Sequence, residues 1–150
     1  MDPAIRLYQD ADYAALCSLE QKNTPGECKP AVFVRQAGVL FPTTFFVAEK
    51  GGAIIGYTIG ACLQHDPSRA WIIRLAVNEE ERRQGLGRDL VATVIDALRR
   101  MGIREVLLSV SPENLAARSL YETFGFANVG FHAGYFGTGA DRIIMSRIIG

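Results

Sequence analysis

The sequence has few of the residues from which disulfide scaffolds and metal sites are made. It contains three cysteines, Cys17, Cys28 and Cys62, and only two histidines among 150 residues. The cysteine number is odd and no two cysteines lie at a metal-ligand spacing, so free thiols are the simplest interpretation. We therefore expect no disulfide framework, no bound metal, and a reducing, cytoplasmic environment.

Long apolar runs and a surplus of one charge are also missing. No apolar run approaches ~18 residues and no basic, apolar leader opens the sequence, so we expect no membrane contact. The 16 basic residues balance the 16 acidic ones, which argues against nucleic acid as a partner. Hydrophobic residues make up 49% of the chain, which suffices for the core of a single domain over residues 1–150, expected as a monomer or homodimer.

The most informative segment is a run rich in arginine and glycine, Arg82-Arg83-Gln84-Gly85-Leu86-Gly87-Arg88. It separates a strand-like run over 71–77 from a strongly periodic helix that reaches Met101. A glycine turn at a helix start presents several backbone N–H groups to one point, and the missing Cβ atoms let a ligand come close. The segment therefore predicts a phosphorylated ligand, most simply a pyrophosphate. The turn lacks the Gly-Lys-Ser/Thr ending of a P-loop.

The hydrophobic pattern predicts an α/β (α+β) fold with the element order β-α-α-β-β-β-α-β-α-β-β. Asp10 is expected to cap the first helix and Thr24-Pro25-Gly26 to end it. Further helices are expected over 31–40, 86–101 and 112–124. Strands are expected over 5–7, 44–49, 53–63, 71–77, 105–110, 127–133 and 143–149.

The run over 71–77 is expected to be a central strand that is covered on both faces. Arg74 is the exception in this apolar strand, because a buried charge must find a partner or face a cleft. Simple alternation places Ile72, Arg74 and Ala76 on one face, and Trp71, Ile73, Leu75 and Val77 on the other.

A second motif follows the strand expected over 105–110. It reads N-x-x-A-x-x-x-Y-x-x-F-G-F from Asn114 to Phe126. Together with R-x-x-G-x-G from Arg82 and the order of the elements, it resembles the GNAT superfamily of acyl-CoA-dependent N-acyltransferases over essentially the whole chain. The resemblance implies a central mixed, mostly antiparallel sheet with helices on both faces, whose strands splay apart near Leu75 and Ser109.

The resemblance also implies roles for single residues, with acetyl-CoA as co-substrate and no metal. Tyr121 would lie near the thioester sulfur and protonate the departing thiolate. Asn114 would bind the pantetheine arm, which Leu75, Ala76 and Val77 would hold as a strand bonds its neighbour. The pyrophosphate would lie on the turn formed by Arg82, Arg83, Gln84, Gly85, Leu86, Gly87 and Arg88.

The same residues have plainer interpretations. Tyr121 is also explained as a core aromatic at helical spacing, and Asn114 as a helix cap, a role that is compatible with ligand binding. The arginines of the turn are also explained as a solvated helix start. Glu79-Glu80-Glu81 is more typical of a solvated turn than of a catalytic cluster.

Reference pKa values favour one kind of acceptor. Proton donation from a tyrosine near ~10 to a thiol near ~8.5 is uphill by ~1.5 units, or about 2 kcal/mol. Deprotonating an α-amine near ~8 at neutral pH costs about 1.4 kcal/mol, whereas a lysine-type amine costs about 4.6 kcal/mol. A site without a strong base therefore suits an α-amine better.

Within the superfamily, the chain looks most like the N-terminal protein acetyltransferases of the ribosomal-protein-alanine type. It departs from them at Ser109, where a Glu usually serves as base, and at Tyr135-Phe136, where a tyrosine pair is usual. We predict transfer of an acetyl group from acetyl-CoA to a primary amine, with a protein N-terminal α-amine as the first candidate. A small-molecule amine (a diamine, polyamine or aminoglycoside) and a non-catalytic acyl-CoA-binding module remain alternatives, and the base is unassigned.

Overall fold

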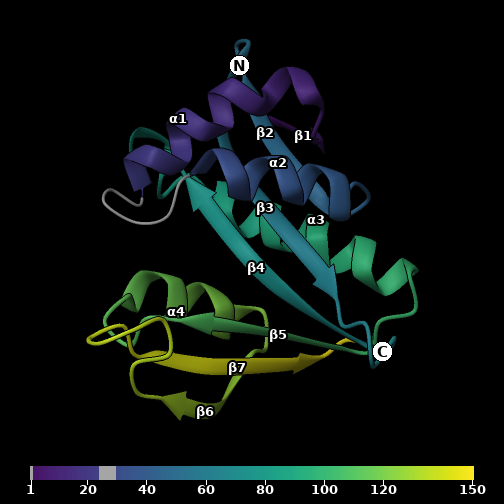
Figure 1. The fold of residues 1–150 in the computed structure, drawn as a ribbon, viewed down its shortest axis with the longest axis vertical. Coiled ribbons are helices and arrows are strands. Elements are labelled where there is room, and N and C mark those ends of the chain that lie inside the picture. The colour runs from purple at the N-terminus through teal and green to yellow at the C-terminus, as the bar shows by residue number, and fades with distance from the viewer. Residues whose placement is uncertain (1, 24–29) are drawn as a thin grey trace.

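The computed structural model describes residues 2–23 and 30–150, which form a seven-stranded sheet with helices on both faces (Figure 1). Thr24-Pro25-Gly26 and Cys28 lie outside the described residues. The helices are α1 (Tyr13–Asn23), α2 (Pro30–Leu40), α3 (Leu86–Arg100) and α4 (Leu115–Thr123). The strands are β1 (Ala4–Leu7), β2 (Phe45–Lys50), β3 (Ala53–Cys62), β4 (Arg69–Val77), β5 (Glu105–Val110), β6 (Ala127–His132) and β7 (Arg142–Ile148).

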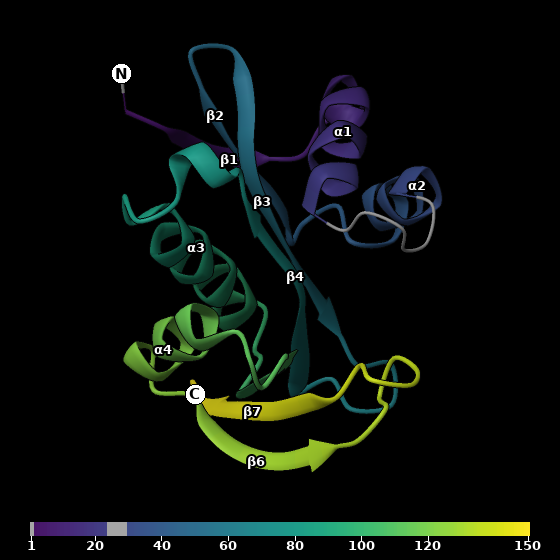
Figure 2. The same ribbon diagram turned by 90° about the vertical axis from the view of Figure 1, so that its left-hand side faces the viewer.

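The sheet is mixed and mostly antiparallel, as the sequence predicted. Its strand order is β1-β2-β3-β4-β5-β7-β6, and β4 with β5 is the one parallel pair among the described strands. Helices α1 and α2 lie on one face of the sheet, and α3 and α4 lie on the other (Figure 2). None of the helices in the described part of the chain is long and apolar enough to cross a membrane.

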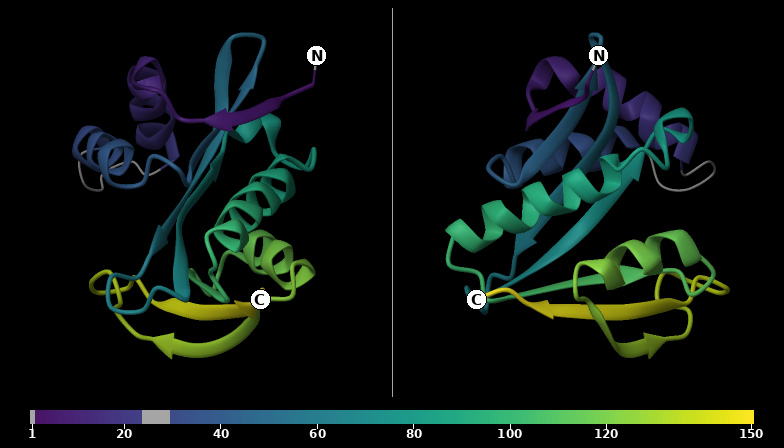
Figure 3. Two further views of the ribbon diagram at one scale, coloured as in Figure 1. Left: turned by 90° about the vertical axis from the view of Figure 1, so that its right-hand side faces the viewer. Right: turned by 180° about the vertical axis from the view of Figure 1, so that it is seen from behind.

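Helix α3 forms the largest contact between a helix and the sheet. Its apolar positions recur at helical spacing and all become buried: Leu86, Leu90, Val91, Val94, Ile95 and Leu98. Burial of each such side chain contributes about 1.5–3 kcal/mol. The helix begins after Gly85 and ends before Gly102, both with positive φ (83° and 88°). Figure 3 shows α3 lying across the β2–β4 part of the sheet, with α4 next to β5.

Strand β4 carries a bulge that the sequence did not reveal. In the pairing with β3, Ile59 lies opposite Arg74 and Gly60 lies opposite Ile72, so Ile73 is an extra residue. The expected alternation is therefore wrong across this point. Ile72 and Leu75 both pack toward α3, whereas Ala76 joins the core under α1 and α2.

Strands β4 and β5 pair for only a short distance. Their register covers Arg69–Trp71 of β4 against Glu105–Leu107 of β5 and then stops. Figure 1 shows the two strands together near the C-terminus and parting toward the opposite side. This confirms the predicted splay near Leu75 and Ser109. On its other edge, β5 stays paired with β7 along its whole length, where Ser109 lies opposite Ile144.

The first helix starts later than expected. Asp10 does not cap it, because Asp10–Asp12 form a 3-10 turn and α1 begins at Tyr13. Asp12 takes the capping role in this turn, since its carboxylate accepts a hydrogen bond from the Gln9 N–H at 2.9 Å. Asp12 is held there by Arg6, whose guanidinium donates two hydrogen bonds to it at 2.8 and 2.9 Å.

Gly56 allows the backbone of β3 to lie close to that of β4. A Cβ atom at this position would lie 2.9 Å from the backbone oxygen of Ala76. We expect Gly56→Ala to lower the free energy of unfolding by about 1–3 kcal/mol, because backbone must move. Gly130→Ala is the control, since its Cβ would meet only the Ile144 Cβ, at 3.9 Å. Equal stability of the two variants in urea unfolding would contradict this account.

Candidate active site

A cavity of about 730 Å³ lies at the open end of the splayed strands. Three segments that are distant in the sequence line it: the end of β4, the arginine–glycine turn, and the start of α4. The lining residues are Arg74, Leu75, Ala76, Val77, Arg82, Arg83, Gly85, Gly87, Arg88, Asn114, Ala116, Ala117 and Leu120. Four of them are arginines and none is acidic or a histidine, so the cavity suits an anionic ligand.

The backbone of the turn has an unusual conformation. Gly85, the residue before α3, has φ 83°, and Arg83 also has positive φ (66°). A Cβ at Gly85 would meet no atom within 4 Å, so its glycine is required by conformation. At Gly87, which has no positive φ, a Cβ would lie 3.3 Å from Leu120, so glycine there lets α3 approach α4.

The backbone N–H and C=O groups of Leu75 and Val77 point away from β3. The N–H of Asn78 donates to the Ile55 oxygen on β3 at 2.7 Å. Because the hydrogen-bonding direction alternates along a strand, Ala76 and Arg74 also face β3, and Leu75 and Val77 face the splay. Strand β5 has ended its pairing there, which leaves an open strand edge within the cavity.

Side chains complete the cavity on both sides of this edge. Arg82 donates from Nε to the Val77 carbonyl at 3.0 Å, so its side chain lies across the end of β4. Asn114 both lines the cavity and caps α4, since its Oδ1 accepts a hydrogen bond from the Ala117 N–H at 3.1 Å. Both interpretations of Asn114 thus remain compatible.

Two residues of the predicted turn lie apart from this cavity. Gln84 and Leu86 line a separate space of about 160 Å³, together with Asp2, Lys50 and Asp89. The Leu86 side chain packs in the core with Ala48 and Ile55. Any contact of Leu86 with a ligand in the large cavity would therefore come from its backbone.

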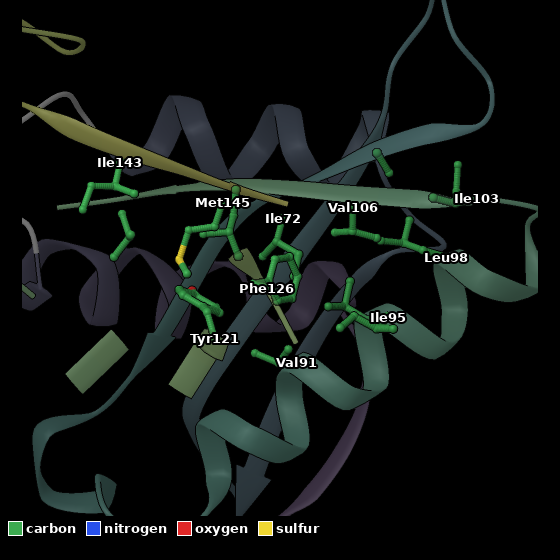
Figure 4. Packing of buried hydrophobic residues seen from close by; sticks show 14 residues of the cluster. Ile72, Val91, Ile95, Leu98, Ile103, Val106, Tyr121, Phe126, Ile143 and Met145 are labelled. Carbon is green, nitrogen blue, oxygen red and sulfur yellow. The ribbon is translucent and has the colours of Figure 1, made fainter. Parts of the chain in front are cut away.

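Tyr121 belongs to the apolar core beside the cavity. Its ring lies 5.8 Å from that of Phe126, edge to face, among Val91, Ile143 and Met145 (Figure 4). Burial raises the pKa of Tyr121 to about 12, although the positive charges of Arg74 and Arg142 lower it. Relative to a thiol near ~8.5, the proton donation is thus uphill by about 5 kcal/mol in the free protein.

Arg74 has a partner that the sequence did not identify. Its Nε lies 2.7 Å from Oε1 and 3.1 Å from Oε2 of Glu20, which comes from α1. The Tyr57 hydroxyl donates to the same carboxylate. Glu20 and Arg74 are 54 positions apart, so only the packing of α1 on the sheet brings them together.

Other candidates from the sequence lie outside the cavity. Ser109 is half-buried in β5 opposite Ile144. Glu81 forms an ion pair with Lys50 at 3.1 Å. Tyr135 and Phe136 lie on the exposed connection after β6, with their rings 4.9 Å apart. In the described part of the chain, no three His, Cys, Asp or Glu residues are placed to hold a metal ion.

The buried hydroxyl of Tyr121 predicts a loss of stability at alkaline pH. An unfolded tyrosine loses its proton near ~10, but folded Tyr121 retains it to about 12. Between these values the unfolded state binds fewer protons, so Tyr121 lowers the free energy of unfolding by up to about 3 kcal/mol as pH rises. In urea unfolding at several pH values, the free energy of unfolding of Tyr121→Phe should fall less steeply with rising pH than that of the wild type. The same fall in both proteins would contradict the burial of this hydroxyl.

Known proteins resemble this chain in sequence and in fold. Residues 8–126 match the acetyltransferase (GNAT) family. The chain is 38% identical to the ribosomal protein bS18-alanine N-acetyltransferase of Escherichia coli K12, and the match covers 87% of this chain and 95% of that protein. It is also 38% identical over 90 residues to human N-acetyltransferase 8B, covering 57% of this chain and 39% of that protein. The chain thus spans about two fifths of the length of the first curated relatives it matches.

Solved structures agree with the sequence match. Ard1 from Thermoplasma volcanium superposes with a TM-score of 0.90 at 23% identity, covering 99% of each chain. The ribosomal-protein-S18-alanine N-acetyltransferase of Escherichia coli superposes with a TM-score of 0.85 at 27% identity, covering 99% of this chain and 94% of that one. With the family match over most of its length and this fold, the chain belongs to the acetyltransferase (GNAT) family.

Proposed function

We propose that the protein is an acetyl-CoA-dependent N-acetyltransferase that acts on an α-amine, with a protein N-terminus as acceptor. The observation that carries this is the cavity at the splay, where a strand edge, a glycine turn and four arginines meet. The E. coli relative, named as an alanine N-acetyltransferase of ribosomal protein bS18, supports an N-terminal acceptor.

The residues of the cavity fit two parts of acetyl-CoA, the pyrophosphate and the pantetheine arm. The positive-φ turn at Arg83 and Gly85, with Arg88, suits the pyrophosphate. The Leu75 N–H and C=O and the Val77 N–H face the splay, whereas the Val77 carbonyl already accepts from Arg82. These three groups suit the amides of the pantetheine arm, because buried unpaired backbone groups are costly and a ligand that pairs them gains affinity. Acetyl-CoA supplies an activated acyl group, so the protein has to position an amine and manage protons.

The protein's own residues would manage the charges of a direct attack by the amine. A strand amide at Leu75 or Val77 would polarise the carbonyl, as an oxyanion-type donor. Tyr121 would supply the proton to the leaving sulfur, and its burial keeps the hydroxyl neutral until then. No carboxylate or imidazole lines the described cavity, so a water relay would take the proton from the amine.

The lack of a base in the described cavity favours an α-amine over a polyamine. No carboxylate or imidazole lines this cavity to take a proton from the acceptor. Without a strong base, an amine with a pKa near ~8 also costs about 3 kcal/mol less to deprotonate than one near ~10.4. Phe131 in β6 and Tyr135 and Phe136 in the connection to β7 are exposed and offer aromatic contacts to a peptide. Figure 2 shows that this connection reaches toward the side of the sheet that carries α1 and α2.

Gly85 provides a matched test of acetyl-CoA binding. We expect Gly85→Ala to raise the Kd of acetyl-CoA roughly tenfold, because alanine at positive φ costs about 1–2 kcal/mol and the turn relaxes away from its ligand-binding shape. Gly102→Ala is the control, since Gly102 also has positive φ (88°) with an open Cβ position but lies at the far end of α3. Titration calorimetry of both variants checks this, and equal affinities would contradict the role of the turn.

Acceptor choice and the proton donor are tested together by steady-state kinetics. We expect kcat/KM for peptides with a free N-terminal alanine to exceed that for diamines, polyamines and aminoglycosides by at least roughly tenfold.

Tyr121→Phe should lower kcat about 10²–10⁴-fold and leave acetyl-CoA affinity unchanged, as expected for loss of a general acid. Full turnover by this variant across the alkaline range would remove Tyr121 from the mechanism. Tight acetyl-CoA binding without transfer to any amine would indicate a binding module.

A further inference from the structure

We propose that Arg74 is a further residue of the reaction site. Glu20 and Tyr57 hold its guanidinium at the inner end of the cavity, where its charge stabilises the negative charge that bond cleavage leaves on sulfur. This inference rests on the proposed acetyl transfer and adds a charged residue to it. Arg74 would touch the reacting atoms, and Glu20 and Tyr57 would be positioning residues.

The position of Arg74 follows from the bulge in β4. The extra residue, Ile73, turns the next residues so that Arg74 points to the face under α1, while its own segment still borders the cavity. Three residues of strand, or about 10 Å, separate Arg74 from Val77 at the glycine turn. Arg74 therefore lies at the opposite end of the cavity from the turn that suits the pyrophosphate.

The contacts of Arg74 fix its side chain. The Glu20 carboxylate accepts two contacts from Nε, and only 9% of the Glu20 side chain and 25% of the Arg74 side chain are exposed. The Arg74 backbone is also held, because its carbonyl accepts a hydrogen bond from the Thr58 hydroxyl at 2.9 Å. A guanidinium held at Nε presents its other nitrogen atoms in a defined direction.

The charged and titratable groups around this point come from four elements. Glu20 of α1 contacts Arg74 on one side, and Tyr57 of β3 donates to the Glu20 carboxylate and acts on Arg74 electrostatically. Tyr121 of α4 feels the positive charges of both Arg74 and Arg142, the first residue of β7. Burial lowers the pKa of Arg74, but the hydrogen bond to Glu20 and the charges of Tyr57 and Glu20 raise it above its ordinary value overall. Arg74 thus stays positive throughout.

The reaction creates the charge that Arg74 would stabilise. The amine nitrogen bonds to the carbonyl carbon, and the carbon–sulfur bond breaks with its electron pair left on sulfur. The sulfur takes the Tyr121 proton, the amine loses one proton to water, and Tyr121 regains a proton from solvent. A positive charge near sulfur and Tyr121 favours each anionic stage.

The test measures the affinity of coenzyme A against pH, with desulfo-coenzyme A as the ligand that lacks the thiol. A nearby positive charge lowers a thiol pKa by about one unit or more. For wild-type protein, the affinity for coenzyme A divided by that for desulfo-coenzyme A should therefore rise roughly tenfold when the pH is raised from 7 to 10. Arg74→Gln should abolish this gain, and its kcat should fall about tenfold or more.

Two further variants separate charge from structure. Glu20→Gln/Arg74→Gln also removes the buried carboxylate that has lost Arg74 in the single variant. The double variant should still lack both the pH-dependent gain in coenzyme A affinity and the turnover. Arg69→Gln removes a comparable ion pair of β4, with Glu105 at 2.9 Å and outside the cavity, and should behave as wild type. The proposal would be overturned if Arg74→Gln kept the pH-dependent rise in affinity for coenzyme A. It would also be overturned if the double variant recovered the wild-type kcat. If wild type acetylates no amine, the transfer proposal fails while the binding test still decides on Arg74.

Discussion

The early end of pairing between β4 and β5 is the constraint on which the site depends. After three paired residues, β5 parts from β4 while its other edge stays paired with β7, and the facing edge of β4 is left open. An open edge inside a protein is costly unless something satisfies it. The protein places there a cavity lined by four arginines together with apolar residues of β4 and α4. The parting of two strands thus creates both the space for a ligand and the backbone groups that would bind it.

The bulge at Ile73 links this opening to the face of the sheet under α1 and α2. It shifts the alternation of β4, so that Leu75 packs toward α3 while Arg74 meets Glu20 beneath α1. One charged residue can therefore be tied to the far face and still border the cavity. Burial raises the pKa of Tyr121 and so makes its hydroxyl a weaker acid, whereas the nearby positive charge of Arg74 lowers that pKa. The positions of Arg74 and Tyr121 are in this sense complementary.

Much of the fold follows from local patterns in the sequence. The periodicity of α3, the glycines at its two ends and the order of the elements all predict what the structure contains. The arginine–glycine turn and Asn114 likewise lie where the pattern placed them. The bulge at Ile73 left no local signal, because every residue around it suits a regular strand. The Glu20–Arg74 pair depends on how α1 packs over β3, which the sequence alone does not specify.

The most direct test of the open strand edge is hydrogen exchange of the β4 amides with and without acetyl-CoA. The amides of Leu75 and Val77 face the splay, whereas that of Ala76 faces β3. We expect saturating acetyl-CoA to slow exchange at Leu75 and Val77 roughly tenfold or more, beyond its effect on Ala76. Equal slowing at all three amides, or slowing confined to the helices, would contradict the claim that this edge holds the ligand.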